Sequence, residues 1–248
     1  MASLEDETFR EVKSRLVDTM QKTEWIPLSL TLVEYPQGDF FGKLLALISL
    51  IPFAIIAGII TLILFRRDLH TITFFSGMII NDIINFILKH TICEARPMRR
   101  NVHVEYGMPS SHAQFMWFFA AYTTLFICIR LHHNNNSSVS ERFWRVTSIA
   151  ACIIIALLVT YSRVYLLYHS ISQVLCGAFI GIILGVVWFL IMHIVLTPFF
   201  PIIVSWRISE YLLLRDTTLI PNILWFEYTN IRTEARARSR KLVSMKSQ

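Results

Sequence analysis

Long apolar runs without a single Lys, Arg or Glu constrain the fold of this chain more than any other feature. Two of them, residues 44–65 and 174–196, are long enough for a helix rising about 1.5 Å per residue to cross the ~30 Å hydrocarbon core of a bilayer. Three further runs, at residues 71–88, 113–129 and 146–161, are shorter or carry polar side chains. Because lipid offers no partner to backbone polar groups, each run must be helical. The sequence therefore predicts an all-α polytopic membrane helical bundle with about five membrane helices.

Proline interrupts two other apolar stretches, residues 25–41 and 198–206. We interpret both as interfacial or re-entrant, which leaves a sixth membrane element open. Residues 1–24 repeat apolar side chains at three- and four-residue steps, which predicts an amphipathic helix on the membrane interface. The expected division is an N-terminal segment 1–24, a membrane domain 25–206 and a polar cytosolic tail 207–248.

Hydrophobic residues make up 54% of the chain and charged residues only 16%, against about a quarter in soluble domains. This composition excludes an intrinsically disordered chain. The net charge of +6 is diluted by apolar sequence instead of being concentrated on a polar face, so we expect no nucleic-acid partner. The four cysteines are scattered, which excludes a disulfide framework and a zinc-ligand spacing.

The distribution of Lys and Arg predicts the orientation in the membrane. With five spans, one side carries residues 66–70, 130–145 and the chain after 206, with 13 Lys and Arg. The other side carries ten, but three of these belong to polar motifs and four lie in the N-terminal segment. We therefore expect the first side to be cytosolic and the second to face the lumen or exterior.

Three polar islands interrupt the apolar sequence, at residues 89–97, 107–112 and 162–169. In the five-span layout all three fall on the same face of the membrane. They contain Lys, Arg, His and hydroxyl side chains but few acids. Such a set suits a dense anion, and phosphate is the natural candidate.

The islands contain the groups that phosphoryl transfer requires. Arg96 and Arg163 present planar forks of donors to phosphate oxygens, while Lys89 supplies a compact charge. Residues 109–112 directly precede an apolar run, which predicts a first helical turn whose free N–H groups face the anion. Together these groups would stabilise a phosphoryl group in transit. Because no cluster with metal-ligand spacing accompanies them, we expect the three cations to replace a magnesium clamp and the enzyme to need no cofactor.

His112 and His169 divide the remaining chemistry. One histidine must attack phosphorus and form a phosphohistidine that water then cleaves. The other can protonate or hydrogen-bond the departing oxygen. The residue types alone do not decide which histidine has which role.

Lys-x6-Arg-Pro, Pro-Ser-x-His and Ser-Arg-x5-His, in this order, resemble the three-part signature of the type 2 phosphatidic-acid-phosphatase superfamily of membrane phosphatases. The resemblance implies a helical bundle of that kind and a role for each matching residue. These are phosphate binding for Lys89, Arg96, Ser110 and Arg163, with Arg163 also catalytic, assistance to the leaving group for His112, and nucleophilic attack for His169.

The chain departs from the superfamily pattern at two positions. Ser111 stands where the pattern has glycine, which adds a hydroxyl close to the anion and makes Ser111 a further phosphate-binding candidate. Gln173 stands where the pattern has aspartate, four residues after His169. One helical turn on, its amide oxygen could accept the imidazole N–H and orient the ring. A neutral amide stabilises an imidazolium less than a carboxylate does, and we hypothesise that Gln173 is matched to a diphosphate, whose leaving group is better than an alkoxide.

Further stretches, among them EYPQGDF, YGMPSSHAQFMWFF and SRVYLLYHSISQVL, resemble the branch of the superfamily that acts on dolichyl diphosphate in the endoplasmic reticulum membrane. This implies an acid-anhydride hydrolase that converts this polyisoprenoid diphosphate lipid to dolichyl phosphate and inorganic phosphate on the lumenal side, which recycles the carrier lipid for N-glycosylation. One alternative is another lipid phosphate substrate: phosphatidate, a sphingoid-base phosphate or a shorter isoprenoid diphosphate. The other is a catalytically inactive, lipid-binding scaffold.

Two expectations concern residues outside the islands. Asp82 lies within the run 71–88, where a carboxylate facing lipid is costly, so we expect it to face the bundle interior. Asn135 and Asn136 fit the glycosylation acceptor pattern. On the expected topology their loop is cytosolic, so we expect neither to carry a glycan.

Overall fold

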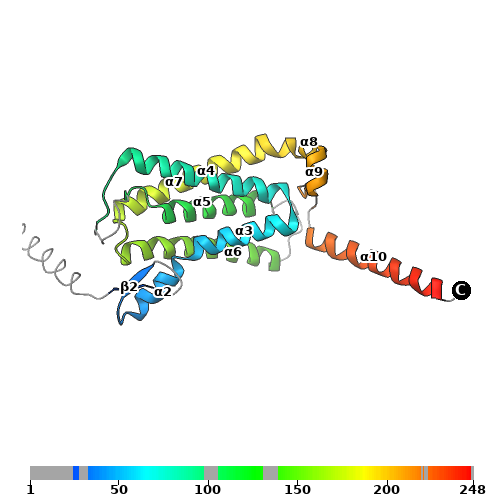
Figure 1. Cartoon of the computed structure of the whole chain (residues 1–248), viewed down its shortest axis with the longest axis horizontal. Coiled ribbons are helices and arrows are strands. Elements are labelled where there is room, and N and C mark those ends of the chain that lie inside the picture. The colour runs from blue at the N-terminus through cyan, green and yellow to red at the C-terminus, as the bar shows by residue number, and fades with distance from the viewer. Residues whose placement is uncertain are drawn as a thin grey trace, which may run out of the picture.

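Long helices arranged as an antiparallel bundle make up most of the protein, as the computed structural model shows for residues 25–27, 33–97, 106–130, 139–218, 220 and 223–246 (Figure 1). In these residues, five helical segments are long and apolar enough to cross a membrane: Phe40–Arg66, Leu69–Ile92, Ser111–Ile129, Arg142–Tyr165 and Ile171–Val204. Each contains one of the apolar runs of the sequence. The predicted fold class, an all-α polytopic bundle, is confirmed. The amphipathic helix expected in residues 1–24 and the acceptors Asn135 and Asn136 lie outside the described residues.

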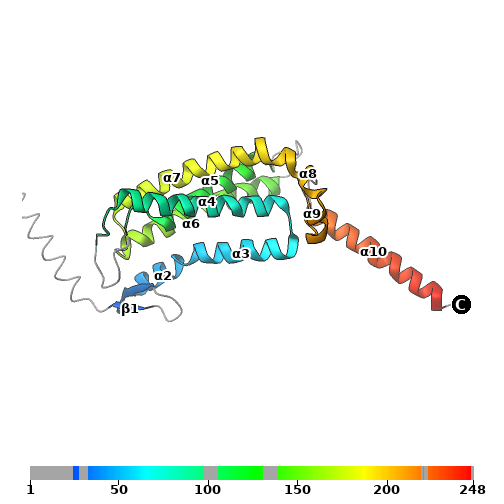
Figure 2. The ribbon, with the colours of Figure 1, turned by 45° about the horizontal axis from the view of Figure 1, so that its top comes forward.

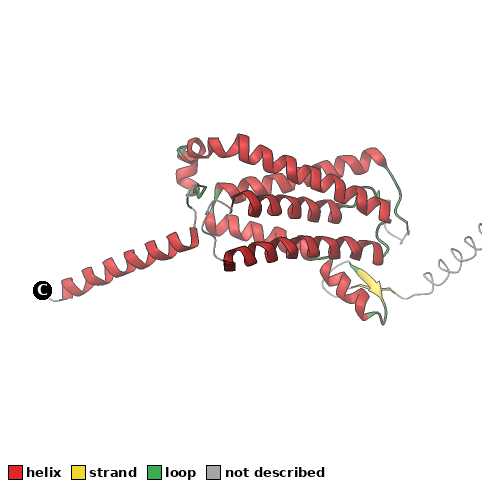
Figure 3. Cartoon of the chain, turned by 180° about the vertical axis from the view of Figure 1, so that it is seen from behind, coloured by secondary structure: helices red, strands yellow, loops and turns green. Residues whose placement is uncertain are grey.

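The elements follow one another along the chain as β1 (Trp25–Pro27), β2 (Glu34–Pro36), α2 (Phe40–Ile48), α3 (Ile51–Arg66), α4 (Leu69–Ile92), α5 (Ser111–Leu125), α6 (Val139–Tyr165), α7 (Ile171–Leu190), α8 (Phe200–Val204), α9 (Arg207–Leu212) and α10 (Ile223–Lys246). A π-helical turn, Phe126–Arg130, extends α5, and a second, Ile191–Leu196, leads from α7 towards α8. Figure 3 shows the pair of strands at one end of this helical structure.

The described residues of the proline-interrupted stretch 25–41 form two short strands and the start of α2, with no membrane span of their own. β1 and β2 pair in antiparallel fashion, with Ile26 opposite Tyr35. α2 then begins at Phe40 and joins α3 after a break at residues 49–50, where Pro52 lies in the first turn of α3. Proline is tolerated there because the first-turn N–H has no intrahelical partner. α2 and α3 together make the first candidate span.

α5 is the centre of the bundle and packs most closely against α7. Gly177, Gly181 and Gly185 recur at every fourth position of α7 and are all buried. A Cβ atom at Gly177 would lie 2.7 Å from the Ser110 carbonyl oxygen, and one at Gly185 would lie 2.7 Å from that of Phe118. These glycines let the two backbones approach each other, as small residues do between membrane helices. The start of α5 is thereby held against the start of α7.

A polar layer crosses the otherwise apolar core between α4 and α5. Asn85 Nδ2 donates to Gln114 Oε1 at 2.7 Å, and Gln114 Nε2 donates to the carbonyl and side-chain oxygens of Asn81 at 3.0 and 3.1 Å. All three side chains are buried, whereas Asp82 is exposed on the surface of α4. The expectation that Asp82 faces the interior is therefore wrong. One helix position of about 100° separates it from Asn81, which takes the interior place.

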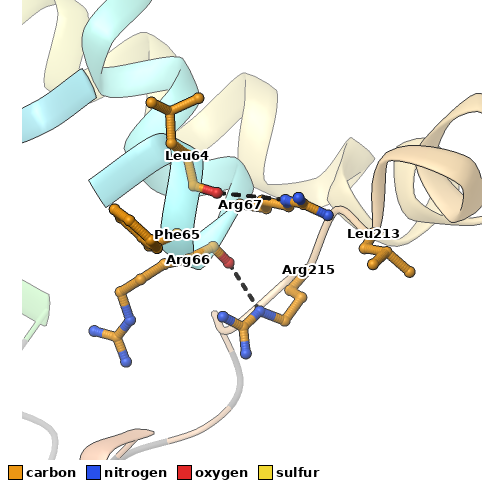
Figure 4. A pocket seen from close by; sticks show the side chains of 6 residues that line it. All are labelled: Leu64, Phe65, Arg66, Arg67, Leu213 and Arg215. Atoms are coloured by element: carbon orange, nitrogen blue, oxygen red, sulfur yellow. Dashed lines mark hydrogen bonds between the residues drawn. The ribbon is translucent and has the colours of Figure 1, made fainter. Parts of the chain in front are cut away.

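Arginines at the other end of the bundle tie the chain before α10 to the end of α3. Arg215 Nε donates to the Arg66 carbonyl oxygen at 2.8 Å, and Arg67 Nε to that of Leu64 at 3.4 Å (Figure 4). Arg66 and Arg215 also share the two carboxylate oxygens of Glu227, at 2.9 and 3.2 Å. These arginines line a pocket at this end of the bundle (Figure 4). Arg67 and Arg215 donate to carbonyl oxygens at the C-terminal end of α3, and Arg66 and Arg215 hold α10 through Glu227.

α10 extends away from the bundle, and Figure 2 shows the same projection after a 45° turn. Its described side chains from Asn230 to Lys241 are exposed. No apolar period marks this helix in the sequence, and none of its described side chains from Asn230 to Lys241 is buried against the bundle. Ala, Arg, Glu and Lys nevertheless have high intrinsic helix propensity, which accounts for a helix in a segment expected to be only a polar tail.

Candidate active site

The residues singled out in the three polar islands lie at the end of the bundle opposite α10 (Figures 1 and 3). They occupy helix ends and the segments that join them: Lys89 in the last turn of α4, Arg96 in the segment after α4, Ser110 directly before α5, Ser111 and His112 in its first turn, Arg163 in the last turn of α6, His169 between α6 and α7, and Gln173 in the first turn of α7. Electrostatic interactions connect both histidines to Arg163, Arg96 and Lys89, so these residues form one cluster.

His169 is buried, with 2% of its surface exposed, and its Nδ1 faces two oxygen atoms. The Gly107 carbonyl oxygen lies 3.0 Å from Nδ1 and Gln173 Oε1 lies 3.3 Å from it. Because both oxygens can only accept, Nδ1 must carry the ring hydrogen. Nε2 of the neutral ring is then left with its lone pair, which is what a nucleophile needs.

The surroundings of His169 also keep its ring neutral. Burial lowers the pKa of His169 from 6.5 to about 3, and the positive charges of Arg163, Arg96 and Lys89 act in the same direction. The hydrogen bond to Gln173 opposes this shift of the pKa. At neutral pH the imidazole is therefore neutral, with its single hydrogen on Nδ1.

Arg163 and Ser110 bring buried donors to the cluster. Arg163 is 6% exposed and its guanidinium carbon lies 4.1 Å from the centre of the Tyr168 ring, a cation–π arrangement. Within the described residues, Arg163 Nε and Ser110 Oγ are buried and have no hydrogen-bond partner. Since buried polar atoms are nearly always paired, two such atoms beside a cluster of cations indicate a site for oxygen atoms of an anion.

The beginning of α5 adds backbone groups to the site. Ser110 is the N-cap residue, and its side chain makes no capping bond to the helix. Its own N–H donates to the Gln173 carbonyl oxygen at 3.1 Å. Asn85 of α4 also holds this turn in place, because its Nδ2 donates to the Pro109 carbonyl oxygen at 3.4 Å as well as to Gln114 Oε1. The first N–H groups of α5, at Ser111 and His112, have no intrahelical partner and provide a site for a phosphate.

Comparison with known proteins assigns the family. The PAP2 superfamily pattern matches residues 70–196, which span α4 to α7 and thus the whole cluster. The chain belongs to the PAP2 superfamily. A protein of Rhinolophus ferrumequinum named Dolichyldiphosphatase 1 is 52% identical over 88% of this chain and 93% of its own length. The Dictyostelium discoideum protein of the same name is 42% identical over 84% of this chain and 90% of its own length.

A further relative, Lipid phosphate phosphatase gamma of Arabidopsis thaliana, is 39% identical over 89% of this chain and 95% of its own length. No solved structure matches the chain. The relatives cover most of the chain, so the similarity is not confined to the three motifs. The chain is a PAP2 lipid phosphatase, a hydrolase with several membrane helices.

Two residues at this site were not assigned a functional role from the sequence. Glu94, between Lys89 and Arg96, accepts a hydrogen bond at 2.9 Å from Gln173 Nε2. Tyr168 holds the Arg163 guanidinium against its ring, and its hydroxyl accepts from the Glu34 backbone N–H at 2.9 Å. The contacts of Glu94 with Gln173 and of Tyr168 with Glu34 have no sequence signal, because each joins segments far apart in the chain.

Phe53 of α3 borders the cluster on the side of His112. The two rings meet edge to face, with centres 5.9 Å apart, and Phe53 is 60% exposed.

In the part of the chain that the structure describes, no group of three His, Cys, Asp or Glu side chains is placed to hold a metal ion. The positive charge of the site is supplied by its Lys and Arg side chains.

Proposed function

We propose that this protein hydrolyses dolichyl diphosphate to dolichyl phosphate and inorganic phosphate through a phosphohistidine intermediate. The observation that carries the proposal is the state of His169, a buried neutral imidazole with Nε2 available. Beside it lie three cations and two buried donor atoms, Arg163 Nε and Ser110 Oγ, that have no partner among the described residues. The names of the relatives give the substrate class.

In the first step, Arg163, Arg96 and Lys89 hold the oxygens of the terminal phosphoryl group, together with Ser110 Oγ, the Ser111 hydroxyl and N–H groups of α5. His169 Nε2 attacks phosphorus and forms the N–P bond while the bond to the bridging oxygen breaks. The electron pair of that bond leaves with dolichyl phosphate, and His112, protonated in the substrate complex, transfers its proton to the departing oxygen. The cations stabilise the transferring group because they are fixed in place before it arrives.

In the second step, water attacks the phosphohistidine. His112 accepts the proton of the water, the N–P bond breaks, and its electron pair returns to His169 Nε2. Inorganic phosphate leaves and the neutral His169 is restored. Arg163, Arg96 and Lys89 supply the charge stabilisation for which many phosphoryl-transfer enzymes use Mg²⁺, so no metal takes part in either step.

Purified full-length protein in detergent, assayed with dolichyl diphosphate in the presence of EDTA, tests this mechanism. We expect phosphate release without divalent metal, none above background for His169→Ala, and acid-labile label on the wild type after a quench with terminally ³²P-labelled substrate. Phosphate release that persists in His169→Ala would remove His169 as the nucleophile. A parallel assay with phosphatidate tests the alternative lipid phosphates, which the name of the Arabidopsis relative favours as a second candidate class.

The lumenal orientation of the site and its role in recycling the carrier lipid for N-glycosylation are part of the same proposal. They are supported by the excess of Lys and Arg on the opposite side, where α10 adds exposed basic side chains. Dolichyl phosphate is the product expected of such recycling. Accumulation of dolichyl diphosphate in cells depleted of the protein, reversed by wild type and not by His169→Ala, would support this role.

A further inference from the structure

We infer that Glu94 is a positioning residue that acts through Gln173 and supplies the carboxylate that the PAP2 pattern places four residues after the nucleophile. In this chain that position is Gln173, and the carboxylate lies one side chain further away, on the segment after α4. The inference rests on the proposed function, because it assigns Glu94 a part in the reaction of His169.

Every polar atom of the Gln173 amide is engaged. Nε2 donates to Glu94 Oε1 and to the Ala95 carbonyl oxygen, both at 2.9 Å. Oε1 lies 3.3 Å from His169 Nδ1 and accepts from the Ser170 N–H at 3.3 Å. The opposite orientation of the amide would direct its oxygen at two oxygen acceptors and its N–H groups at a backbone donor. Glu94 and Ala95 therefore fix the amide with Oε1 towards His169.

Glu94 also holds the second acceptor of the same imidazole hydrogen. Its backbone carbonyl oxygen accepts from the Gly107 N–H at 2.6 Å, and the Gly107 carbonyl oxygen faces His169 Nδ1 at 3.0 Å. Gly107 and Gln173 are themselves in close contact, since a Cβ at Gly107 would lie 2.6 Å from Gln173 Nε2. Through its side chain and its backbone, Glu94 thus positions both oxygens that orient the nucleophile.

The charge of Glu94 has a chemical use in this arrangement. Phosphoryl transfer to Nε2 makes the His169 ring positive, and a hydrogen-bonded chain of carboxylate, amide and imidazole polarises towards that charge. An amide whose N–H donates to a carboxylate is a better acceptor at its oxygen. Glu94 is exposed, so water screens part of its charge. We expect a moderate contribution, similar to the about 10- to 100-fold that outer partners of metal-binding histidines typically provide.

The arrangement also couples residues 94 and 173. A carboxylate at position 173 would face the Glu94 carboxylate and the Ala95 carbonyl oxygen, where two negative charges repel and one of them takes up a proton. The same carboxylate becomes acceptable when residue 94 is an amide that can donate to it. Exchange of the two functional groups should therefore be tolerated better than either change alone.

The test compares the steady-state kinetics of purified full-length wild type, Glu94→Gln, Gln173→Glu and the double variant with dolichyl diphosphate. Glu94→Gln keeps an acceptor for Gln173 and removes only the charge, so we expect kcat to fall about tenfold with KM within about twofold. Gln173→Glu should lose more than this. The double variant should recover at least tenfold over Gln173→Glu, although the contact with the Ala95 carbonyl oxygen keeps it below wild type. Additive losses in the double variant, or wild-type kcat in Glu94→Gln, would overturn the inference.

Two controls separate positioning from a general loss of structure. Glu210→Gln changes another exposed glutamate, on α9 at the opposite end of the bundle, and should leave kcat and the thermal midpoint unchanged. Glu94→Ala removes the carboxylate altogether, and because the position is exposed we expect added formate to restore part of kcat. No recovery by formate at any concentration would count against a carboxylate role.

The same assays distinguish this inference from the proposed function. If wild type releases no phosphate from dolichyl diphosphate, or His169→Ala retains full activity, the proposed function fails. If wild type is active and His169→Ala is not, but residues 94 and 173 show no coupling, only the role of Glu94 fails.

Discussion

At the residue scale, the contacts of His169 Nδ1 decide which ring nitrogen can react. The motif spacing predicted the residue types at the site, and the structure brings all of them to one end of the bundle. The i+4 spacing placed Gln173 near His169, but the closer oxygen, that of Gly107 at 3.0 Å, belongs to a backbone group 62 residues away. Every residue has a backbone carbonyl group, so a sequence motif cannot show which one accepts this hydrogen bond. The Gly107 acceptor could therefore not be predicted from sequence.

The low pKa of His169 predicts a specific pH dependence for Arg96→Gln. Removing a nearby positive charge makes the imidazolium less unfavourable, so the pKa of His169 should rise from about 3 towards 6.5. The ratio of kcat/KM between variant and wild type, measured from pH 4 to pH 8, should therefore fall on the acidic side. Titration of the substrate affects both proteins equally and cancels in this ratio.

Arg96→Gln should also lower kcat/KM at every pH by about 10- to 100-fold, because a charged contact to phosphate is lost. A ratio that is constant over the whole pH range would mean that Arg96 does not act on the His169 pKa.

Gly107→Ala is expected to disturb the orientation of His169 without unfolding the bundle. The new Cβ would lie 2.6 Å from Gln173 Nε2, and the amide must move even though four hydrogen-bond contacts hold it. We expect kcat to fall about 10- to 100-fold, as when the partners that orient metal-binding histidines are lost. Steady-state kinetics and a thermal unfolding curve check this prediction, and wild-type kcat would show that the amide can move without consequence.

At the scale of the elements, hydropathy located the spans well because lipid leaves helix as the only solution for a long apolar run. The direction in which single side chains point was less predictable. Asp82 and Asn81 are neighbours in the same apolar run, yet only Asn81 is buried. The partner of Asn81, Gln114, belongs to α5. Which face of α4 is buried therefore depends on how α4 packs against α5, and the sequence of α4 alone does not show this.

The close packing of α5 against α7 predicts a loss of stability for Gly177→Ala. The added Cβ would lie 2.7 Å from the Ser110 carbonyl oxygen, which is backbone and cannot turn away. We expect the free energy of unfolding to fall by about 1–3 kcal/mol, the usual cost of overpacking. Activity should fall as well, because the N-terminal turn of α5 would be displaced.

Gly58→Ala provides the matched control for this change. Gly58 lies in α3 and is exposed, and a Cβ atom added there would meet no atom within 4 Å beyond its own helix and chain neighbours. Alanine there should be neutral or stabilising by up to about 1 kcal/mol, because it favours helix. Thermal unfolding in the same detergent compares the two variants, and equal midpoints would mean that the α5–α7 contact is not tight.

At the scale of the whole molecule, the described bundle has two chemically different ends. One end carries the cluster of histidines and cations, and the other carries the arginines beside Glu227 and the basic helix α10. The total charge of +6 could not by itself separate these two uses of positive charge. In the proposed orientation the three cations of the site run against the positive-inside pattern, as a role in substrate binding would require, whereas those of α10 and the adjoining loops agree with it.

This asymmetry predicts which end faces the lumen. Chemical labelling of Cys93 and of a cysteine introduced at position 239 can test the prediction. Cys93 is a free, exposed thiol directly after α4 at the end that carries the site, and Ser239 is exposed on α10. In sealed microsomes that contain the Ser239→Cys variant, a membrane-impermeant maleimide should label position 239 at once. Cys93 should react only after detergent opens the vesicles, and Cys93→Ser identifies its signal. Immediate labelling of Cys93 with protection of position 239 would invert the topology and place the phosphatase site in the cytosol.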